Sequence, residues 1–531
     1  MVAVCRFFLF LLPFLATIVY ANKTLIFCSE GSPSGFDPGQ YHSSIDYDAS
    51  AETLFNRLIQ FKRGSTILKP ALATHWTVSQ DGLTYTFHLR RGVPFHTTDY
   101  FKPTRDFNAD DVVFTFERMR NPRHVFRLMY PTEFPLFSDI GLDKNIIGVF
   151  KVDPHTVRFV LRRPDAVFVH NLSLCFASIH SFEYAQQLYK KRQASQINLK
   201  PIGTGPFILK SYKRNQQIRY VANKRYWDKS PDGQVKLDAL IFSITPESKI
   251  RAQKIKSGEC HVTVNPKPEE LLTLKQHPDI NLMSQTGFNI SYLAYNTQKK
   301  PLNQRLVRQA LDMAIDKGAI LKAIYKDQAI QIANPMPPKQ WGYNAMVSNT
   351  PYNPRLAKQL LDKAGYSHGF SIKLFAMSTQ RPYNPNGRLM AEMIQADWQK
   401  IGVKTIIATP EWGRYTQLAK SGEHDAMLYG WMGNADPDTW LGTFLTCSAV
   451  KGSNYTKWCH QSFDTLIIKA KTTHNLPERI KLYQAAQRIV HAQVPMTLLA
   501  STIVHQPVRK EVVNFKIGLF GTNAFYGVGL Q

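Results

Sequence analysis

The sequence Ser371-Ile-Lys-Leu-Phe-Ala-Met377 is typical of a strand, and the polar loop Ser378-Thr-Gln-Arg-Pro-Tyr-Asn-Pro-Asn386 follows it directly. Apolar residues then recur at helical spacing from Arg388 to Ile401, and Gly402 ends the predicted helix. A second strand, Val403-Lys-Thr-Ile-Ile407, completes the unit. This strand–loop–helix–strand order indicates an α/β sheet, in which ligands bind beside the carboxyl ends of the strands.

The loop of this unit places Arg381 at the carboxyl end of a strand. Pro382 and Pro385 restrict the backbone conformations on either side of the loop. A guanidinium on a stiff loop is well suited to bind a carboxylate through two parallel hydrogen bonds. The alternative is an ordinary solvated arginine, and the loop alone does not decide between the two.

A second loop follows another predicted strand and reads Gly430-Trp-Met-Gly-Asn-Ala-Asp436-Pro-Asp438. We expect this acidic loop to face Arg381 across one crevice, with the rings of Tyr383, Trp412 and Trp431 nearby. A cation, an acid and aromatic rings together suit the recognition of a zwitterion better than they suit bond breaking.

Motifs of common hydrolytic and metal-dependent enzymes are absent from the sequence. It contains no His-Glu-x-x-His zinc pattern, no Gly-x-Ser-x-Gly nucleophile turn and no Cys-x-x-Cys pair. Asp436 and Asp438 form a candidate acid/base pair, although Asp-Pro-Asp is also typical of a turn that caps a helix. We therefore expect no catalytic residue, metal or cofactor, and keep an exported hydrolase as the alternative.

Turn-forming and helix-capping residues predict several elements outside these loops. Asp81-Gly82 lies between strand-forming runs and indicates a hairpin. Asn108 is expected to cap one helix. Another is expected to have Asn353 as its cap and Pro354 as its first residue, with Gly365 just past its end. An apolar face at helical spacing predicts a further helix from Ala49 to Phe61.

Residues 1–21 are predicted to be a secretory signal peptide. Arg6 precedes an apolar run from Phe7 to Tyr20, and Val19-Tyr20-Ala21 matches a cleavage site. The run is shorter than the ~20 residues that span a bilayer, and no later stretch approaches that length. We therefore expect a soluble, exported mature protein.

The cysteines agree with an oxidising compartment. Of the six, Cys5 leaves with the signal peptide, so at least one of the remaining five is unpaired. Cys447 and Cys459 flank the turn-forming segment Gly452-Ser-Asn-Tyr455, which favours a small disulfide loop.

The chain is large and strongly basic. Its 531 residues predict two or three domains, and its 44% apolar residues are ample for large cores. The formal net charge of +26 suggests anionic surroundings or anionic ligands. Nucleic acid is not the expected partner, because the cations are spread along the chain and no nucleic-acid-binding motif occurs.

A series of motifs, in the same order along the chain, resembles the periplasmic dipeptide-binding proteins of ABC importers. These belong to the bacterial extracellular solute-binding protein family 5, with the oligopeptide, nickel and antimicrobial-peptide binders. The motifs are Cys28-Ser-Glu-Gly-Ser-Pro33, Trp76 with Asp81-Gly82 and Phe87-His-Leu-Arg90, Pro201-Ile-Gly-Thr-Gly-Pro-Phe207, Gln380-Arg-Pro-Tyr-Asn-Pro-Asn386, Glu411-Trp-Gly413, and Gly452-Ser-Asn-Tyr455 with Lys457-Trp-Cys459.

The resemblance implies a two-lobed α/β periplasmic binding protein fold with an extra inserted domain. The two lobes close around a ligand. The implied segments are 22–54 with 205–286 and 506–531 for lobe I, 55–204 for the inserted domain, and 287–505 for lobe II. The resemblance also implies the disulfides Cys28–Cys260 and Cys447–Cys459, which leave Cys175 free.

The same resemblance assigns roles to the two loops. Arg381 matches the arginine that holds the ligand carboxylate, and Tyr383 and Trp412 match aromatic residues of the pocket. The family motif Gly-Trp-x-Gly-Asp-Asn-Gly-Asp-Pro-Asp is one residue longer than the loop in this chain. Its first Asp receives the ligand ammonium, and Asn434 stands there instead.

A neutral amide does not offset the cost of burying an ammonium. Either Asp436 replaces the missing acid, or the ligand is not a simple dipeptide. The expected ligand-binding residues are Arg381, Tyr383, Trp412, Trp431, Gly433, Asn434 and Asp436.

The sequence thus predicts the periplasmic solute-binding component of an ABC transporter. We expect it to capture short, dipeptide-like peptides as a monomer and to deliver them to an inner-membrane permease complex. The alternative ligands are an antimicrobial or murein peptide, glutathione or haem. A cationic adhesin that binds through charge alone is the remaining class, and its binding would be lost in salt.

Overall fold

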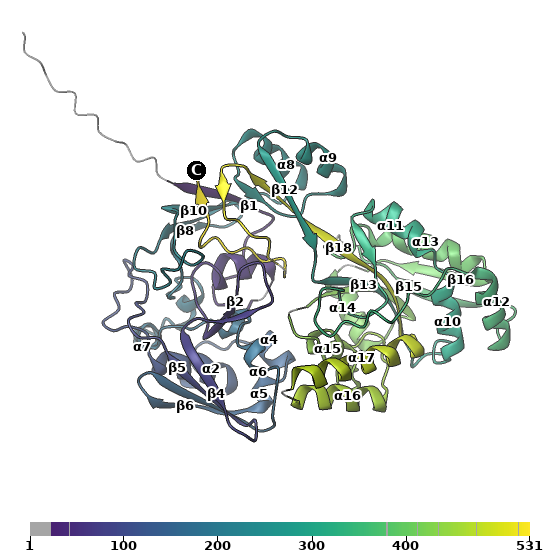
Figure 1. The fold of residues 1–531 in the computed structure, drawn as a ribbon, viewed down its shortest axis with the longest axis horizontal. Coiled ribbons are helices and arrows are strands. Elements are labelled where there is room, and N and C mark those ends of the chain that lie inside the picture. The colour runs from purple at the N-terminus through teal and green to yellow at the C-terminus, as the bar shows by residue number, and fades with distance from the viewer. Residues whose placement is uncertain are drawn as a thin grey trace, which may run out of the picture.

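The computed structural model describes residues 23–41, 43–378, 381–410, 412–433, 435–473, 475–518 and 520–531. A 12-stranded sheet runs through the molecule, and a separate four-stranded sheet lies beside it (Figure 1). Helices cover these sheets, which confirms the predicted α/β class. The predicted signal peptide, 1–21, lies outside the described residues. Within the described ranges, no helix has the length and apolar character needed to cross a membrane.

Strand β18 (Met496–Arg509) belongs to both halves of the large sheet. Its first residues pair with β13 (Asn289–Tyr295) and β14 (Ala329–Gln331). Its last residues pair with β12 (Ile280–Thr286) and β11 (Val262–Thr263). We call β12 and β18 the hinge strands, because they run side by side from lobe I to lobe II (Figure 1).

Lobe II contains the unit that was predicted from Ser371 to Ile407. Strands β15 (Phe370–Phe375) and β16 (Val403–Ala408) pair in parallel, and α13 (Gly387–Gln399) connects them. The remaining elements of this lobe are α10 (Arg305–Met313), α11 (Lys317–Tyr325), α12 (Pro354–Lys363), α14 (Trp412–Ser421), β17 (Ala426–Met432), α15 (Asp438–Leu445), α16 (Gln461–Thr472) and α17 (Leu476–Gln493).

Lobe I is assembled from segments that lie far apart in the sequence. Its strand order, β11-β1-β10-β9-β8, places the first strand between two later ones. Its other elements are β1 (Thr24–Ser29), α1 (Ser44–Asp46), β8 (Phe207–Lys213), β9 (Gln217–Ala222), β10 (Ala239–Ile244), α8 (Ser248–Ser257), α9 (Leu271–Lys275), β19 (Val512–Val513) and β20 (Gly529–Leu530).

The inserted domain has its own antiparallel sheet in the order β4-β5-β7-β6. Gly82 adopts a φ of +70° in the turn between β4 and β5, so the predicted hairpin is confirmed. The elements are β2 (Ile59–Phe61), β3 (Leu68–Pro70), β4 (Ala73–Val78), β5 (Thr84–Leu89), α2 (Ala109–Arg120), α3 (Val125–Met129), α4 (Pro135–Asp139), α5 (Leu142–Asn145), β6 (Ile146–Asp153), β7 (Thr156–Leu161), α6 (Phe168–Asn171) and α7 (Phe182–Lys190).

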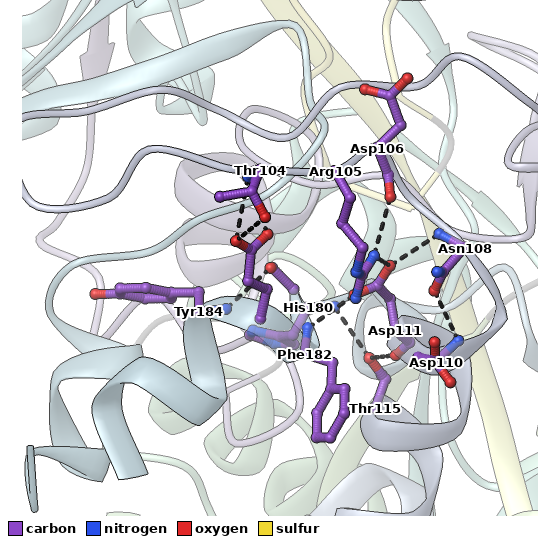
Figure 2. A network of polar contacts seen from close by, with 12 residues as sticks. Thr104, Arg105, Asp106, Asn108, Asp110, Asp111, Thr115, His180, Phe182 and Tyr184 are labelled. Carbon is purple, nitrogen blue, oxygen red and sulfur yellow. Dashed lines mark hydrogen bonds and ion pairs between the residues drawn. The ribbon is translucent and has the colours of Figure 1, made fainter. Parts of the chain in front are cut away.

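A buried carboxylate joins two helix starts in this domain (Figure 2). Asn108 caps α2 as predicted, and Asp111 accepts the Asn108 N–H at 2.9 Å. Asp111 also accepts the Phe182 N–H, at 2.8 Å, from the first turn of α7. Two nitrogens of Arg105 donate to its oxygens at 2.8 and 2.9 Å. These bonds hold α2 and α7 in a fixed relation.

The segment Ala49–Phe61 corrects one prediction, because it is not a helix. A single π-helical turn covers Tyr47–Ala51, and β2 begins at Ile59. Between them the backbone bonds to distant segments: Leu54 accepts the Gly205 N–H at 2.9 Å. These partners replace the helical hydrogen bonds that the apolar spacing predicted.

Both implied disulfides are present. Cys28 pairs with Cys260 in lobe I, and Cys447 pairs with Cys459 in lobe II. Cys175 is buried and unpaired. Three large apolar clusters fill the structure: one among residues 58–202, one among 288–500, and one that joins residues 25–55, 207–262 and 508–528. The predicted domain boundaries themselves stay a prediction.

Acid should destabilise this fold through His96. The ring is buried, and Nε2 lies 3.0 Å from the carbonyl oxygen of Gly205, to which it donates. Burial lowers the pKa of His96 to about 4. The unfolded chain takes up this proton near pH 6.5, so the stability is present above that pH and is lost as the pH falls toward 4.

We expect about 2 kcal/mol of this stability to disappear between pH 7 and pH 5. Denaturant unfolding at both pH values measures the loss, which should shrink by that amount in His96→Gln. The exposed His368 provides the control His368→Gln, whose loss should match the parent protein. An equal loss in all three proteins would contradict the prediction.

Candidate ligand-binding cleft

The loop after β15 holds its shape through its own backbone. Arg381 and Asn384 exchange two backbone hydrogen bonds of 3.0 Å each. The Asn386 side chain then accepts the Leu389 N–H and caps α13. From α11, the Tyr325 hydroxyl donates to the carbonyl of Tyr383 at 2.9 Å. These hydrogen bonds fix the backbone of residues 381–386, on which Arg381 stands.

Tyr383 packs flat against the neighbouring strand β17. A Cβ atom on Gly430 would lie only 2.1 Å from Cδ2 of Tyr383, so the strand needs glycine there. The Tyr383 side chain is buried, and burial raises its pKa although the Arg381 guanidinium opposes this. The hydroxyl is therefore protonated, and Arg381 is the cation beside it.

Strands β15 and β17 pair in parallel, so their carboxyl ends meet at one edge of the sheet. The Arg381 loop and the loop after Met432 therefore leave the sheet at the same edge. That the acidic loop faces Arg381 across one crevice stays a prediction. Trp431 packs on Phe444, with ring centroids 5.7 Å apart. Its buried Nε1–H has no acceptor among the described residues.

The other predicted site residues divide into three cases. Gly433 supports the loop, because a Cβ there would lie 2.4 Å from the Trp440 ring. Trp412 begins α14, but its side chain is not among those described. Asn434 lies outside the described residues. The predicted roles of all three in ligand binding stay predictions.

Asp436 is buried within lobe II. Both carboxylate oxygens accept from Nη2 of Arg479, at 3.0 and 3.1 Å, and Oδ1 accepts the Asp438 N–H at 3.0 Å. The side chain is 0% exposed. An ammonium would therefore compete with Arg479 for this carboxylate. The role of Asp436 as an ammonium acceptor stays a prediction.

Arg381 lines a cavity of about 510 Å³ between the two lobes. Lobe II contributes Tyr325, Gln328, Arg381 and two prolines, and β18 contributes Thr502–His505. The wall from lobe I includes Glu30, Arg251, Asn265 and Lys267. Pockets of roughly 300–1,000 Å³ hold small ligands. The cavity therefore has the size and the polar lining for a small charged molecule.

Sequence reasoning missed most of this wall. Asn265 donates to Glu30 at 2.7 Å across 235 residues of sequence, so no local pattern brings them together. Tyr325 was not among the predicted site residues, although its hydroxyl supports the Arg381 loop. Only the motif around Cys28 carried a signal, since it includes Glu30.

Comparison with known proteins agrees with this architecture. Residues 68–452 match the profile of bacterial extracellular solute-binding proteins, family 5, middle region. Di/tripeptide-binding protein 1 of Pseudomonas aeruginosa is 56% identical over 509 residues, which is 96% of this chain and 94% of that protein.

Two solved structures have the same fold. HbpA2 from Haemophilus parasuis superimposes with a TM-score of 0.89 at 38% identity, covering 96% of this chain and all of that one. The dipeptide-binding protein from Pseudoalteromonas sp. SM9913 in complex with Met-Leu gives 0.84 at 37% identity, again covering 96% and 100%. The chain belongs to family 5 of the bacterial extracellular solute-binding proteins, whose two-lobed fold it has.

Proposed function

We propose that this protein is the periplasmic binding component of an ABC importer for short peptides. It works as a monomer, captures a peptide in the cavity between lobes I and II, and delivers it to an inner-membrane permease. It is a binding protein, not an enzyme. The observation that carries the proposal is the interlobe cavity of about 510 Å³ with Arg381 on a rigid loop in its wall.

The chemistry of the cavity suits a peptide. Arg381 receives the terminal carboxylate through a charged, two-pronged hydrogen bond. The relatives named for dipeptides and di/tripeptides, and the neighbour that holds Met-Leu, support the same ligand class.

Closure of the lobes follows from the hinge strands. In the described part of the chain, β12 and β18 are the only hydrogen-bonded strands that connect the sheet of lobe I with that of lobe II. We take the predicted segments as the moving bodies, because each contains one of the three apolar clusters. A ligand that touches both lobes favours the closed form by its affinity for that form.

A peptide ligand should stabilise the folded protein. At a free concentration one hundred times Kd the expected gain is about 2.7 kcal/mol. Thermal unfolding with a panel of dipeptides and tripeptides, beside glutathione and haem, measures it. A melting temperature that no peptide raises, but that glutathione or haem does, would replace the short-peptide assignment with that ligand.

Arg381→Ala should weaken peptide binding by at least about thirtyfold, because the carboxylate is left in the closed cleft without its cation. Arg381→Lys should restore little, since an ammonium lacks the planar fork. Arg388→Ala is the matched control, because Arg388 is exposed on α13 and pairs only with Glu392 among the described residues. Calorimetry that finds Arg381→Ala and Arg388→Ala equal would remove Arg381 from the site.

Asp436→Asn tests the second loop. If its carboxylate serves Arg479, the variant should bind a free peptide and its N-acetylated form with equal losses. The protein should also lose about 3–5 kcal/mol of stability, because Arg479 is left buried without its partner. A loss confined to the free peptide would instead assign the ammonium to Asp436.

A further inference from the structure

The inserted domain touches lobe II at a place far from the hinge strands. Figure 1 shows α6 beside α15 and α16, away from the place where β12 and β18 run between the lobes. The contact is made by backbone: the Ala166 N–H donates to the carbonyl of Lys471 at 2.8 Å. Lys471 lies in the last turn of α16, where a helix no longer supplies a backbone N–H four residues further on for each carbonyl.

Titratable groups from both sides surround this hydrogen bond. The inserted domain contributes Asp165 and His170, and lobe II contributes Asp436, Asp438, Lys471 and Arg479. His170 Nδ1 lies 3.9 Å from Asp436, and Lys471 Nζ lies 3.4 Å from Asp438. Asp165, Asp436 and Asp438 are 2%, 0% and 8% exposed. Acids of two separate bodies are thus buried against one another.

Lys471 is the cation that compensates acids on both sides. The carboxylate of Asp438 raises its pKa, and Asp165 does so from the inserted domain. Asp165 itself is fixed by its own domain, because its Oδ1 accepts the Val167 N–H at 3.0 Å and its carbonyl accepts the Tyr85 hydroxyl at 2.8 Å. If the lobes part, Asp165 loses Lys471 and α16 loses its cap.

We propose that Ala166, Asp165 and His170 of the inserted domain form a clasp with Lys471, Asp436 and Asp438 of lobe II. The clasp holds the cleft shut on the side away from the hinge. It lengthens the life of the closed complex without touching the ligand. Because apparent affinity scales with the population of the closed form, these remote residues set how tightly the peptide is held.

Lys471→Met tests the clasp, because methionine keeps the length of the side chain and removes its charge. Lys469→Met is the control: Lys469 lies on the same helix, is exposed, and pairs with Glu478 inside lobe II at 3.1 Å. Stopped-flow dissociation of a bound dipeptide should be about tenfold faster in Lys471→Met and unchanged in Lys469→Met. Small-angle scattering of the ligand-free proteins should show a larger radius of gyration for Lys471→Met alone.

Asp165→Asn keeps the acceptor for Val167 and removes the charge across the contact. In that background the effect of Lys471→Met should shrink, because Asp165 precedes Ala166, whose hydrogen bond to the Lys471 carbonyl joins the two bodies. Equal dissociation and scattering for the two lysine variants, or effects of Lys471→Met and Asp165→Asn that simply add, would overturn the clasp. The inference rests on the proposed closure around a peptide, but scattering needs no ligand. If no peptide binds, the proposed function fails while scattering still decides the clasp.

Discussion

The structure depends on one continuous ladder of backbone hydrogen bonds along β18. This strand pairs with β13 and β14 in lobe II and continues into pairing with β12 and β11 in lobe I. A strand that is hydrogen-bonded at both ends resists sliding but still permits twisting and bending between the two sheets. The position of the cavity follows directly, because Thr502–His505 form its wall where the strand leaves one lobe for the other.

Buried acids paired with arginine fix the irregular parts that the sheet does not reach. Asp37 accepts from Arg118 at 2.8 and 2.9 Å, and His180 lies 3.2 Å away. Burial raises the pKa of Asp37, but Arg118 and His180 outweigh it and hold that pKa well below its usual value. This group joins the loop after β1 to the inserted domain. The chain has a net charge of +26, and in this buried group the arginine is neutralised by an acid.

The same arrangement separates two tasks in the second loop of lobe II. Gly433 leaves room for the Trp440 ring, whereas Asp436 turns inward to Arg479. The ion pair between Asp436 and Arg479 therefore anchors one part of the loop, and the Trp440 ring packs against another part at Gly433. A loop that is already held in place in this way costs less to order when a ligand binds.

Local sequence determined much of lobe II and the identity of the Arg381 loop. Asn353, Pro354 and Gly365 punctuate α12 as predicted, with Gly365 at a φ of +88°. The strand–loop–helix–strand unit also followed from periodicity alone. Such signals act within one or two turns of the chain, so they survive without knowledge of the rest. The disulfide partners and the family came from ordered motifs.

Only the tertiary structure decided what each of these elements meets. Leu54 and its neighbours have helical spacing, yet their backbone bonds to Gly205 and other distant residues. Asp436 and Arg479 are 43 residues apart, and Glu30 and Asn265 are 235 apart. A buried polar group must form a hydrogen bond, and its partner can come from any part of the fold and not only from a nearby turn. The sequence therefore identified the arginine of the site, and the fold supplied the wall that faces it.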